Sequence, residues 1–119
     1  MSEETALPPK VQQRLLLFQQ LQQQLQVMLA RKQQLNLELI EVNNALSELE
    51  KVPDDTPIYK SVGSLLIRVE KAKVVQDLED RKVILNSRLE QLSREEKRLR
   101  EQIKEVQAKL RRDLGGPGA

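Results

Sequence analysis

The sequence predicts a mainly helical fold, in which two long helices form an antiparallel coiled coil and a β-hairpin joins them. Charged residues make up 32% of the chain and aromatic residues only 2%, with Leu, Gln, Glu, Lys and Arg prominent. That composition is typical of long helices and coiled coils. Apolar residues recur with a 3-4 spacing on both sides of a central stretch. The central stretch, residues 58–69, reads IYKSVGSLLIRV and has the pattern of two short strands around a turn.

A chain of 119 residues is expected to form a single domain, over residues 1–119. We expect a first helix over about 9–51, a linker and hairpin over about 53–69, a second helix over about 71–113 and a flexible tail over 114–119. Residues 1–7 are expected to be disordered. No region has the composition of a large compact core, so any further apolar surface must find a partner.

The first helix is predicted to begin at Pro8-Pro9, because proline is tolerated in the first helical turn. It should end near Lys51, because Pro53 disfavours helical geometry in the preceding residue. Ten of its twelve seam positions are apolar, which favours a coiled coil. The seam comprises Val11, Phe18, Leu25, Lys32, Leu39 and Leu46 at position a, and Arg14, Leu21, Met28, Leu35, Val42 and Leu49 at position d.

The linker, residues 53–57, reads PDDTP and is typical of a turn. The hairpin that follows has a two-residue loop with Gly63 first. A type II′ turn needs positive φ at that position, which glycine supplies. This loop predicts that Val62 lies opposite Leu65, that Lys60 lies opposite Ile67, and that the strands end with residue 58 opposite residue 69.

The second helix repeats the heptad pattern, with nine of its twelve seam positions apolar. They are Val75, Lys82, Leu89, Glu96, Ile103 and Leu110 at position a, and Leu78, Leu85, Leu92, Leu99, Val106 and Asp113 at position d. The two helices have nearly equal length, so folding back at the hairpin would bury both seams in a rod of roughly 60 Å. Charged seam residues weaken such a seam or set its register, and the sequence leaves their partners open.

The hairpin presents one largely apolar face and two unpaired edges. A two-stranded ribbon is marginal in water by itself. We therefore expect it to pair and pack with hairpins of other subunits. The alternative is a local cap that lies on its own two helices.

The beginning of the first helix has an unusual surface. Between residues 11 and 30 the only charged residue is Arg14, and glutamine fills most positions outside the seam. Leu15, Leu16, Leu17 and Leu29 lie off the seam, so they should be exposed on an isolated coiled coil. Exposed apolar surface of this kind marks a binding site. The alternative is that these residues widen the helix interface or meet a neighbouring coil.

The end of the second helix is basic. Residues 94–112 include eight basic and four acidic residues. A solvated helix face with basic residues near its C-terminus explains this pattern, and a docking patch for an acidic partner is the alternative. Nucleic-acid binding is not expected, because the net charge is only +2 and no aromatic platform accompanies the basic residues.

Several functions are excluded by what the chain lacks. It has no histidine and no cysteine, so histidine acid–base catalysis, thiol nucleophiles and common transition-metal sites are not available. The glycines form a turn and a tail and do not make a phosphate-binding loop. We expect neither an enzyme nor a cofactor. The N-terminus does not resemble a signal peptide and no apolar run could span a membrane, so we expect a cytoplasmic protein.

These features resemble the β-type subunits of the prefoldin family, especially the archaeal ones. The resemblance lies in the first helix with LPPKVQQRLLLFQQLQQQLQ, the Asp-Asp linker, the hairpin IYKSVGSLLIRV and the second helix rich in Glu and Arg. It covers essentially the whole chain, and the hairpin is its most specific part. A single hairpin is typical of the β-type subunit, since the α-type subunit has two.

The resemblance implies a chaperone (holdase) that acts without ATP. It implies a hexamer of two α and four β subunits, in which the hairpins form intersubunit β-barrels. The tips of the coiled coils would hold unfolded polypeptide and deliver it to a group II chaperonin. The alternative is a structural oligomerisation or tethering module without client binding. On the first reading, assembly falls to the hairpin residues Ile58, Tyr59, Val62, Leu65, Leu66, Ile67 and Val69. Client binding falls to Val11, Leu15, Phe18, Val106 and Leu110, and contact with the chaperonin to Lys109, Arg111 and Arg112.

Overall fold

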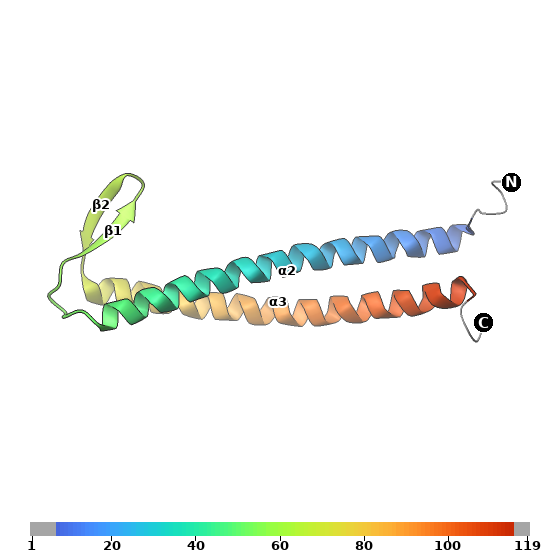
Figure 1. Ribbon diagram of the computed structural model, residues 1–119. Helices are drawn as coiled ribbons and strands as arrows, with labels where there is room; N and C mark the ends of the chain where they lie inside the picture. The colour runs from blue at the N-terminus through green and yellow to red at the C-terminus, as the bar shows by residue number, and fades with distance from the viewer. Residues whose placement is uncertain (1–6, 116–119) are drawn as a thin grey trace. The chain divides into compact units, whose positions relative to one another are not determined.

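The computed structural model describes residues 7–115 of the chain and confirms the predicted fold class. Two long helices, α2 (Pro9–Glu50) and α3 (Lys71–Asp113), flank a hairpin of β1 (Ile58–Val62) and β2 (Leu65–Val69) (Figure 1). The chain divides into two compact units. Among the described residues, unit 1 comprises residues 7–31 and 92–115, and unit 2 comprises residues 32–91. The expected disorder of residues 1–7 and the expected flexible tail fall mostly outside the described residues.

Both ends of α2 follow from prolines. The amide of Gln12 donates to the carbonyl oxygen of Pro8 at 3.0 Å, which closes the first helical turn. At the other end the last turn tightens, because Lys51 N donates to Glu48 O and Val52 N to Leu49 O, at 3.1 and 3.4 Å. Such i to i+3 bonds satisfy terminal carbonyls where a helix cannot continue. The helix ends at Glu50, one residue before the expected end.

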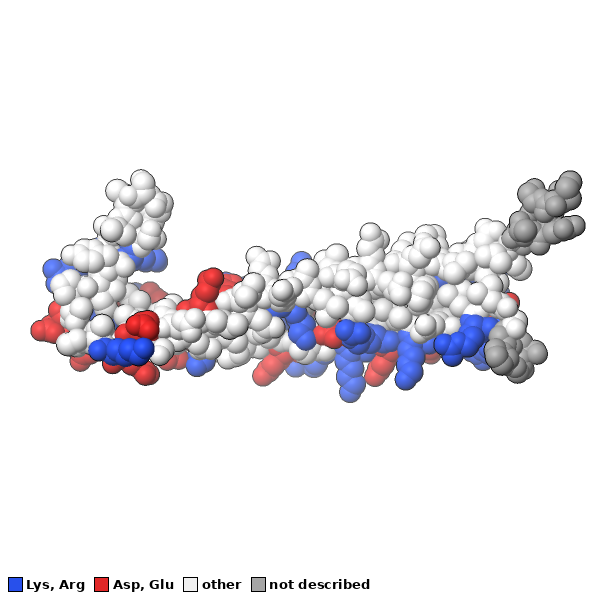
Figure 2. All heavy atoms as spheres, viewed as in Figure 1, with Lys and Arg blue, Asp and Glu red and all other residues white. Residues whose placement is uncertain are grey.

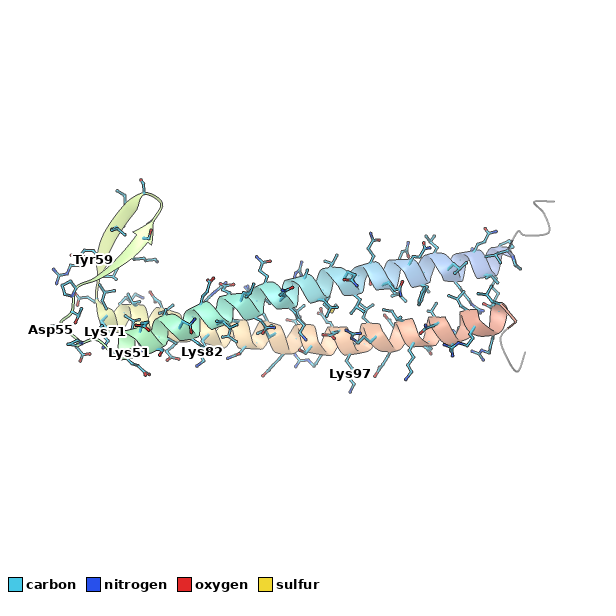
Figure 3. All side chains as sticks on the ribbon, in the orientation of Figure 1. Lys51, Asp55, Tyr59, Lys71, Lys82 and Lys97 are labelled. Carbon is cyan, nitrogen blue, oxygen red and sulfur yellow. The ribbon has the colours of Figure 1, made fainter. Side chains whose placement is uncertain are left out.

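The linker is fastened to the start of α3 by one lysine. The Lys71 ammonium donates to the carbonyl oxygen of Val52 at 2.7 Å and to a carboxylate oxygen of Asp54 at 3.1 Å. Lys71 lies at the hairpin end of α3 (Figure 3), and only 14% of its side chain is exposed. Within the linker, Thr56 N donates to Pro53 O at 3.1 Å. These bonds hold the segment that leads into the hairpin.

The hairpin has the predicted register, in which residues 58 to 62 pair with residues 69 to 65. Gly63 has φ +59°, as the first loop position of a type II′ turn requires. A type I′ turn would need positive φ at Ser64 as well, and no described residue other than glycine has positive φ. The glycine-first loop therefore fixes which residues lie opposite one another.

In unit 1 the start of α2 packs antiparallel against the end of α3. Arg14 near the start of α2 forms an ion pair with Asp113 at the end of α3, while Met28 further along lines a hollow together with Leu99. The buried core of this unit consists of leucines and valines of the predicted seam: Val11, Leu21, Leu92, Leu99 and Leu110. The heptad pattern thus identifies the residues that hold the two helix segments together.

Unit 2 repeats this packing beside the hairpin. Val42 and Leu85 are its buried seam residues, and Leu85 is 0% exposed. On the flank of the seam, the Arg81 guanidinium pairs with the Glu38 carboxylate, with 2.8 Å between Nε and Oε1. Unit 2 therefore has a narrow core, and most of its remaining side chains face solvent.

The end of α3 is closed by a glycine. Leu114 N donates to Leu110 O at 2.9 Å, and Gly115 N donates to Arg112 O at 3.2 Å. Gly115 has φ +72°, the left-handed conformation typical of the residue after a helix. Among residues 7–115, no helix is long and apolar enough to cross a membrane.

Candidate interaction surfaces

The hairpin forms the first candidate surface, because its apolar side chains are not covered by the rest of unit 2. Tyr59, Leu65 and Leu66 are 57%, 63% and 73% exposed. Val62 and Ile67 are nearly half exposed, and only the strand ends, Ile58 and Val69, are half-buried. Exposed apolar side chains at this density favour a partner over a cap lying on its own helices.

Apolar residues lie on both faces of this hairpin. The register places Val62, Leu65 and Ile67 on one face and Tyr59 and Leu66 on the other. β1 and β2 form a sheet of two strands, so each strand keeps one edge without a backbone partner in the sheet. Such edges pair readily with another strand. The hairpin can therefore add strands at its edges and bury side chains on both faces.

The second candidate surface consists of the tip segments, which we define as residues 11–18 of α2 and 103–114 of α3. Val11 and Leu110 are each only 6% exposed and belong to the coiled-coil core. Leu15, Phe18 and Val106 are half-buried. The five predicted client-binding residues thus include two that another polypeptide could reach only if the helices separate.

The exposed apolar side chains of the tip segments are different ones. Leu16 and Leu17 are 56% and 43% exposed, as their off-seam positions predicted, and Leu114 is 57% exposed. Leu15 and Leu29 are half-buried, although their off-seam positions predicted exposure. Heptad position distinguishes the half-buried leucines from the exposed ones. Both half-buried leucines occupy position e beside the seam, whereas Leu16 occupies the outermost position f.

The pairing of one charged seam residue, which the sequence left open, is now visible. Arg14 and Asp113 both occupy d positions and form an ion pair with side chains that are 24% and 20% exposed. This polar layer lies within the tip segments, where it interrupts the apolar seam. Partly buried ion pairs of this kind help to fix register between helices.

Basic side chains gather on α3 in unit 1. Figure 2 shows blue side chains along this part of α3, whereas the corresponding part of α2 is almost entirely white. Lys109, Arg111 and Arg112, the predicted chaperonin contacts, are all exposed, and the two arginines lie in the last helical turn. Their positive charge stabilises the helix C-terminus and is also accessible to an acidic partner.

Among the described residues, no group of three or more acidic side chains is placed to hold a metal ion. The surfaces described above can make apolar contacts, hydrogen bonds through side-chain amides, and backbone hydrogen bonds with another strand.

Comparison with known proteins places this architecture in one family. The family model described as "Prefoldin subunit" matches residues 12–116. Prefoldin subunit beta of Thermococcus gammatolerans is 46% identical over 113 residues, which cover 95% of this chain and 97% of the relative. Prefoldin subunit beta of Methanothrix thermoacetophila is 41% identical over 109 residues, which cover 92% of this chain and 91% of the relative.

Solved structures agree with the sequence relatives. The crystal structure of the prefoldin beta subunit from Thermococcus strain KS-1 matches with a TM-score of 0.83 and 41% identity, covering 94% of this chain and 98% of that one. The beta2 subunit from the same strain shares the fold, with a TM-score of 0.67 and 22% identity. Family model, relatives and structure extend over nearly the whole chain, and the chain therefore belongs to the prefoldin family, as a β-type subunit.

Proposed function

We propose that this chain is a subunit of an ATP-independent chaperone that captures unfolded polypeptide at its coiled-coil tips and delivers it to a group II chaperonin. The observation that carries the proposal is the exposure of Leu16, Leu17 and Leu114 on the tip segments. The α2 part of these segments has one charge, Arg14, and that charge is paired with Asp113. An uncharged surface with exposed leucines suits the apolar segments that unfolded chains display.

Assembly is the task proposed for the hairpin. Its edges would pair with hairpins of an α-type subunit and of other β copies, forming β-barrels in a hexamer of two α and four β subunits. This arrangement would cover Tyr59, Leu65 and Leu66, which are the most exposed apolar residues of the hairpin. Closing strands into a barrel removes unpaired edges. Membership of a family whose relatives are called subunits supports this arrangement.

Several tips acting together give the proposed mechanism its strength. A half-exposed leucine offers roughly 1 kcal/mol of apolar burial, because full burial of such a side chain contributes about 1.5–3 kcal/mol. One tip would therefore bind weakly and release quickly. Tips joined through one hairpin assembly would bind a client together with useful affinity. Transfer to the chaperonin, in the cytoplasm, would need only competition for the same client segments.

The basic end of α3 is the proposed contact with the chaperonin. Lys109, Arg111 and Arg112 are exposed and would meet an acidic surface. Their contribution to the rate of association should fall as the salt concentration rises. Replacing all three with alanine should slow binding to a group II chaperonin at low salt and leave client capture unchanged.

An alternative function, a structural coiled-coil oligomerisation or tethering module without client binding, predicts that the tip leucines are dispensable. The test compares Leu16→Gln/Leu17→Gln with a control on the same helix, Leu37→Gln/Ile40→Gln. The control residues are similarly exposed, at 55% and 54%, but belong to unit 2.

The measurement is suppression of aggregation of a chemically unfolded client by the assembled protein. We expect the tip variant to require about tenfold more protein for half-maximal protection, because the effect of each weakened tip multiplies in a multivalent complex. The control should protect like the wild type. Equal protection by both variants, with the assembly intact, would refute client capture at the tips and favour the structural alternative. Deletion of residues 1–18 together with the segment after Glu105 should also reduce protection and leave the oligomer intact.

A further inference from the structure

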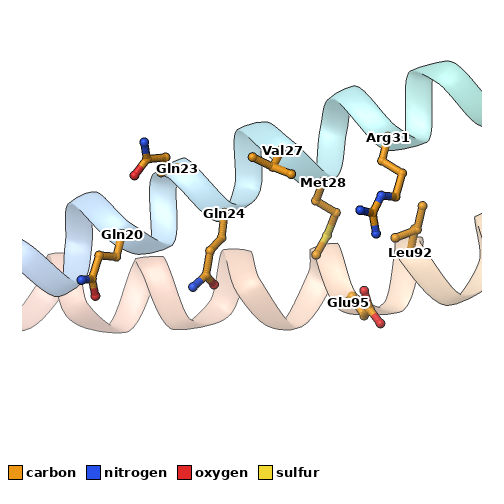
Figure 4. A pocket seen from close by; sticks show the side chains of 8 residues that line it. All are labelled: Gln20, Gln23, Gln24, Val27, Met28, Arg31, Leu92 and Glu95. Atoms are coloured by element: carbon orange, nitrogen blue, oxygen red, sulfur yellow. The ribbon is translucent and has the colours of Figure 1, made fainter.

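A groove in unit 1 lies outside the tip segments. It has a volume of about 590 Å³ and is lined mainly by one stripe of α2, with α3 on the other side (Figure 4). The lining residues are Gln20, Gln23, Gln24, Val27, Met28 and Arg31 from α2, and Leu92 and Glu95 from α3. Met28 points towards α3 in Figure 4, where Leu92 is buried in the seam. The groove therefore combines an apolar base with amide walls.

The amides of this groove are available for bonding. In the part of the chain that the structure describes, no hydrogen bond engages the side chains of Gln20, Gln23 or Gln24. Each such amide offers two donors and an acceptor. Val27 beside them is 61% exposed. Charges lie only at the Arg31 and Glu95 end, so the rest of the groove has no group that selects a charged ligand.

The spacing of the stripe suits an extended chain. From Gln20 to Arg31 the helix rises about 16 Å, at about 1.5 Å per residue. An extended polypeptide covers that length with about five residues, at about 3.3 Å each. Its backbone N–H and C=O groups are free to bond, whereas a helix would already satisfy its own backbone groups. Glutamine amides can donate to the carbonyls and accept from the amides of such a segment.

We propose that this groove binds an extended, uncharged segment of an unfolded polypeptide through its backbone, with Gln20, Gln23 and Gln24 as the recognising groups. The inference rests on the proposed chaperone function and adds to it a second client site with a different chemistry. Apolar tips select apolar side chains. A groove lined with amides forms hydrogen bonds with the backbone groups that every unfolded chain has, and so binds with little sequence preference.

The test uses the full chain labelled with carbon-13 on its methionine methyl groups. The chain has two methionines, and Met28 is the one in the groove. The probe is a capped, uncharged peptide of alternating valine and serine, about seven residues long. A second probe is the same peptide N-methylated at alternate residues, which keeps its side chains but lacks half of its backbone donors. We expect the Met28 signal to shift with the first peptide, and the second peptide to bind about tenfold more weakly, equivalent to about 1.4 kcal/mol.

A pair of variants separates amide recognition from simple apolarity. Gln20→Leu/Gln24→Leu removes two amides and makes the groove more apolar, with little change in helix propensity. Gln22→Leu/Gln26→Leu makes the same chemical change at exposed positions that do not line the groove. We expect the groove variant to bind the unmethylated peptide about tenfold more weakly, and the control to bind it as the wild type does.

Three results of the peptide titrations would overturn the inference. These are an unmoved Met28 signal, equal affinity for the two peptides, and tighter binding by the groove variant. A Met28 shift that depends on protein concentration without peptide would assign the groove to a second copy of the chain and overturn it as well. If the peptide does not bind the groove but protection against aggregation still depends on Leu16 and Leu17, the groove proposal fails and the proposed function is unaffected. If the peptide binds the groove and protection against aggregation does not depend on those leucines, only the proposal of client capture at the tips is refuted.

Discussion

Replacement of Leu85 by alanine tests the packing that holds the helices of unit 2 together. In the described part of the chain, Leu85 is the largest side chain that is fully buried, at 0% exposure. Removing buried methyl groups from a leucine costs about 2–5 kcal/mol, through lost transfer free energy and the cavity left behind. The seam of a coiled coil is narrow and can partly close around the gap, so we expect a loss near the lower half of this range, about 3 kcal/mol.

The matched control is the neighbouring Ile84→Ala. Ile84 is 44% exposed, so the same kind of truncation should cost less than about 1 kcal/mol. Both free energies of unfolding are measured by urea denaturation followed by helical circular dichroism. Protein concentration is held fixed, because the stability of an oligomer depends on it. A difference between the two variants below about 1 kcal/mol would refute the packing derived from the heptad.

Three further predictions concern the hairpin, the linker and the tip ion pair. Gly63→Ala should destabilise the hairpin by about 1 kcal/mol or more, because alanine is strained at φ +59°. The control, Ser64→Ala, should leave the melting temperature unchanged. Equal melting temperatures for the two variants would contradict the type II′ turn. Lys71→Met should remove both side-chain hydrogen bonds to the linker. We therefore expect faster amide hydrogen exchange in the linker and little change in the helices. Unchanged exchange would show that these bonds do not order the linker. Arg14 and Asp113 should show a coupling energy of about 1 kcal/mol in a double-mutant cycle, and this energy should fall as salt is added. Zero coupling at low salt would show that the pair does not fix the register between the helices.

The hairpin was predictable because its loop determines its register. A two-residue loop with glycine first leaves only one pairing of the flanking strands, and the structure has that pairing. The core was predictable for a similar reason. Within residues 7–115, every buried apolar residue, among them Leu21, Val42 and Leu99, occupies an a or d position of the heptad. Local patterns with a fixed period thus determine both features.

The interaction surfaces were less predictable. Heptad phase gives the face of each helix but does not give the register between two helices, so the partner of Arg14 could not be read from the sequence. The family resemblance assigns client binding to Val11 and Leu110 among the apolar residues at the tips, yet their seam positions bury them. The groove beside Met28 depends on how side chains of unequal length meet across the helices. No periodic pattern encodes that shape.

We propose that subunits assemble through the hairpin, and one comparison of mass tests this proposal directly. Ile67 and Ile84 have the same side chain and nearly equal exposure, 46% and 44%, but lie on β2 and α3. The masses of the Ile67→Asp and Ile84→Asp assemblies would be measured by sedimentation, with and without an α-type partner, and helicity would be checked by circular dichroism. We expect the Ile67→Asp assembly to dissociate with most of its helicity retained, and the Ile84→Asp assembly to keep the wild-type mass. An assembly that survives Ile67→Asp, or that both substitutions disrupt equally, would contradict the proposal.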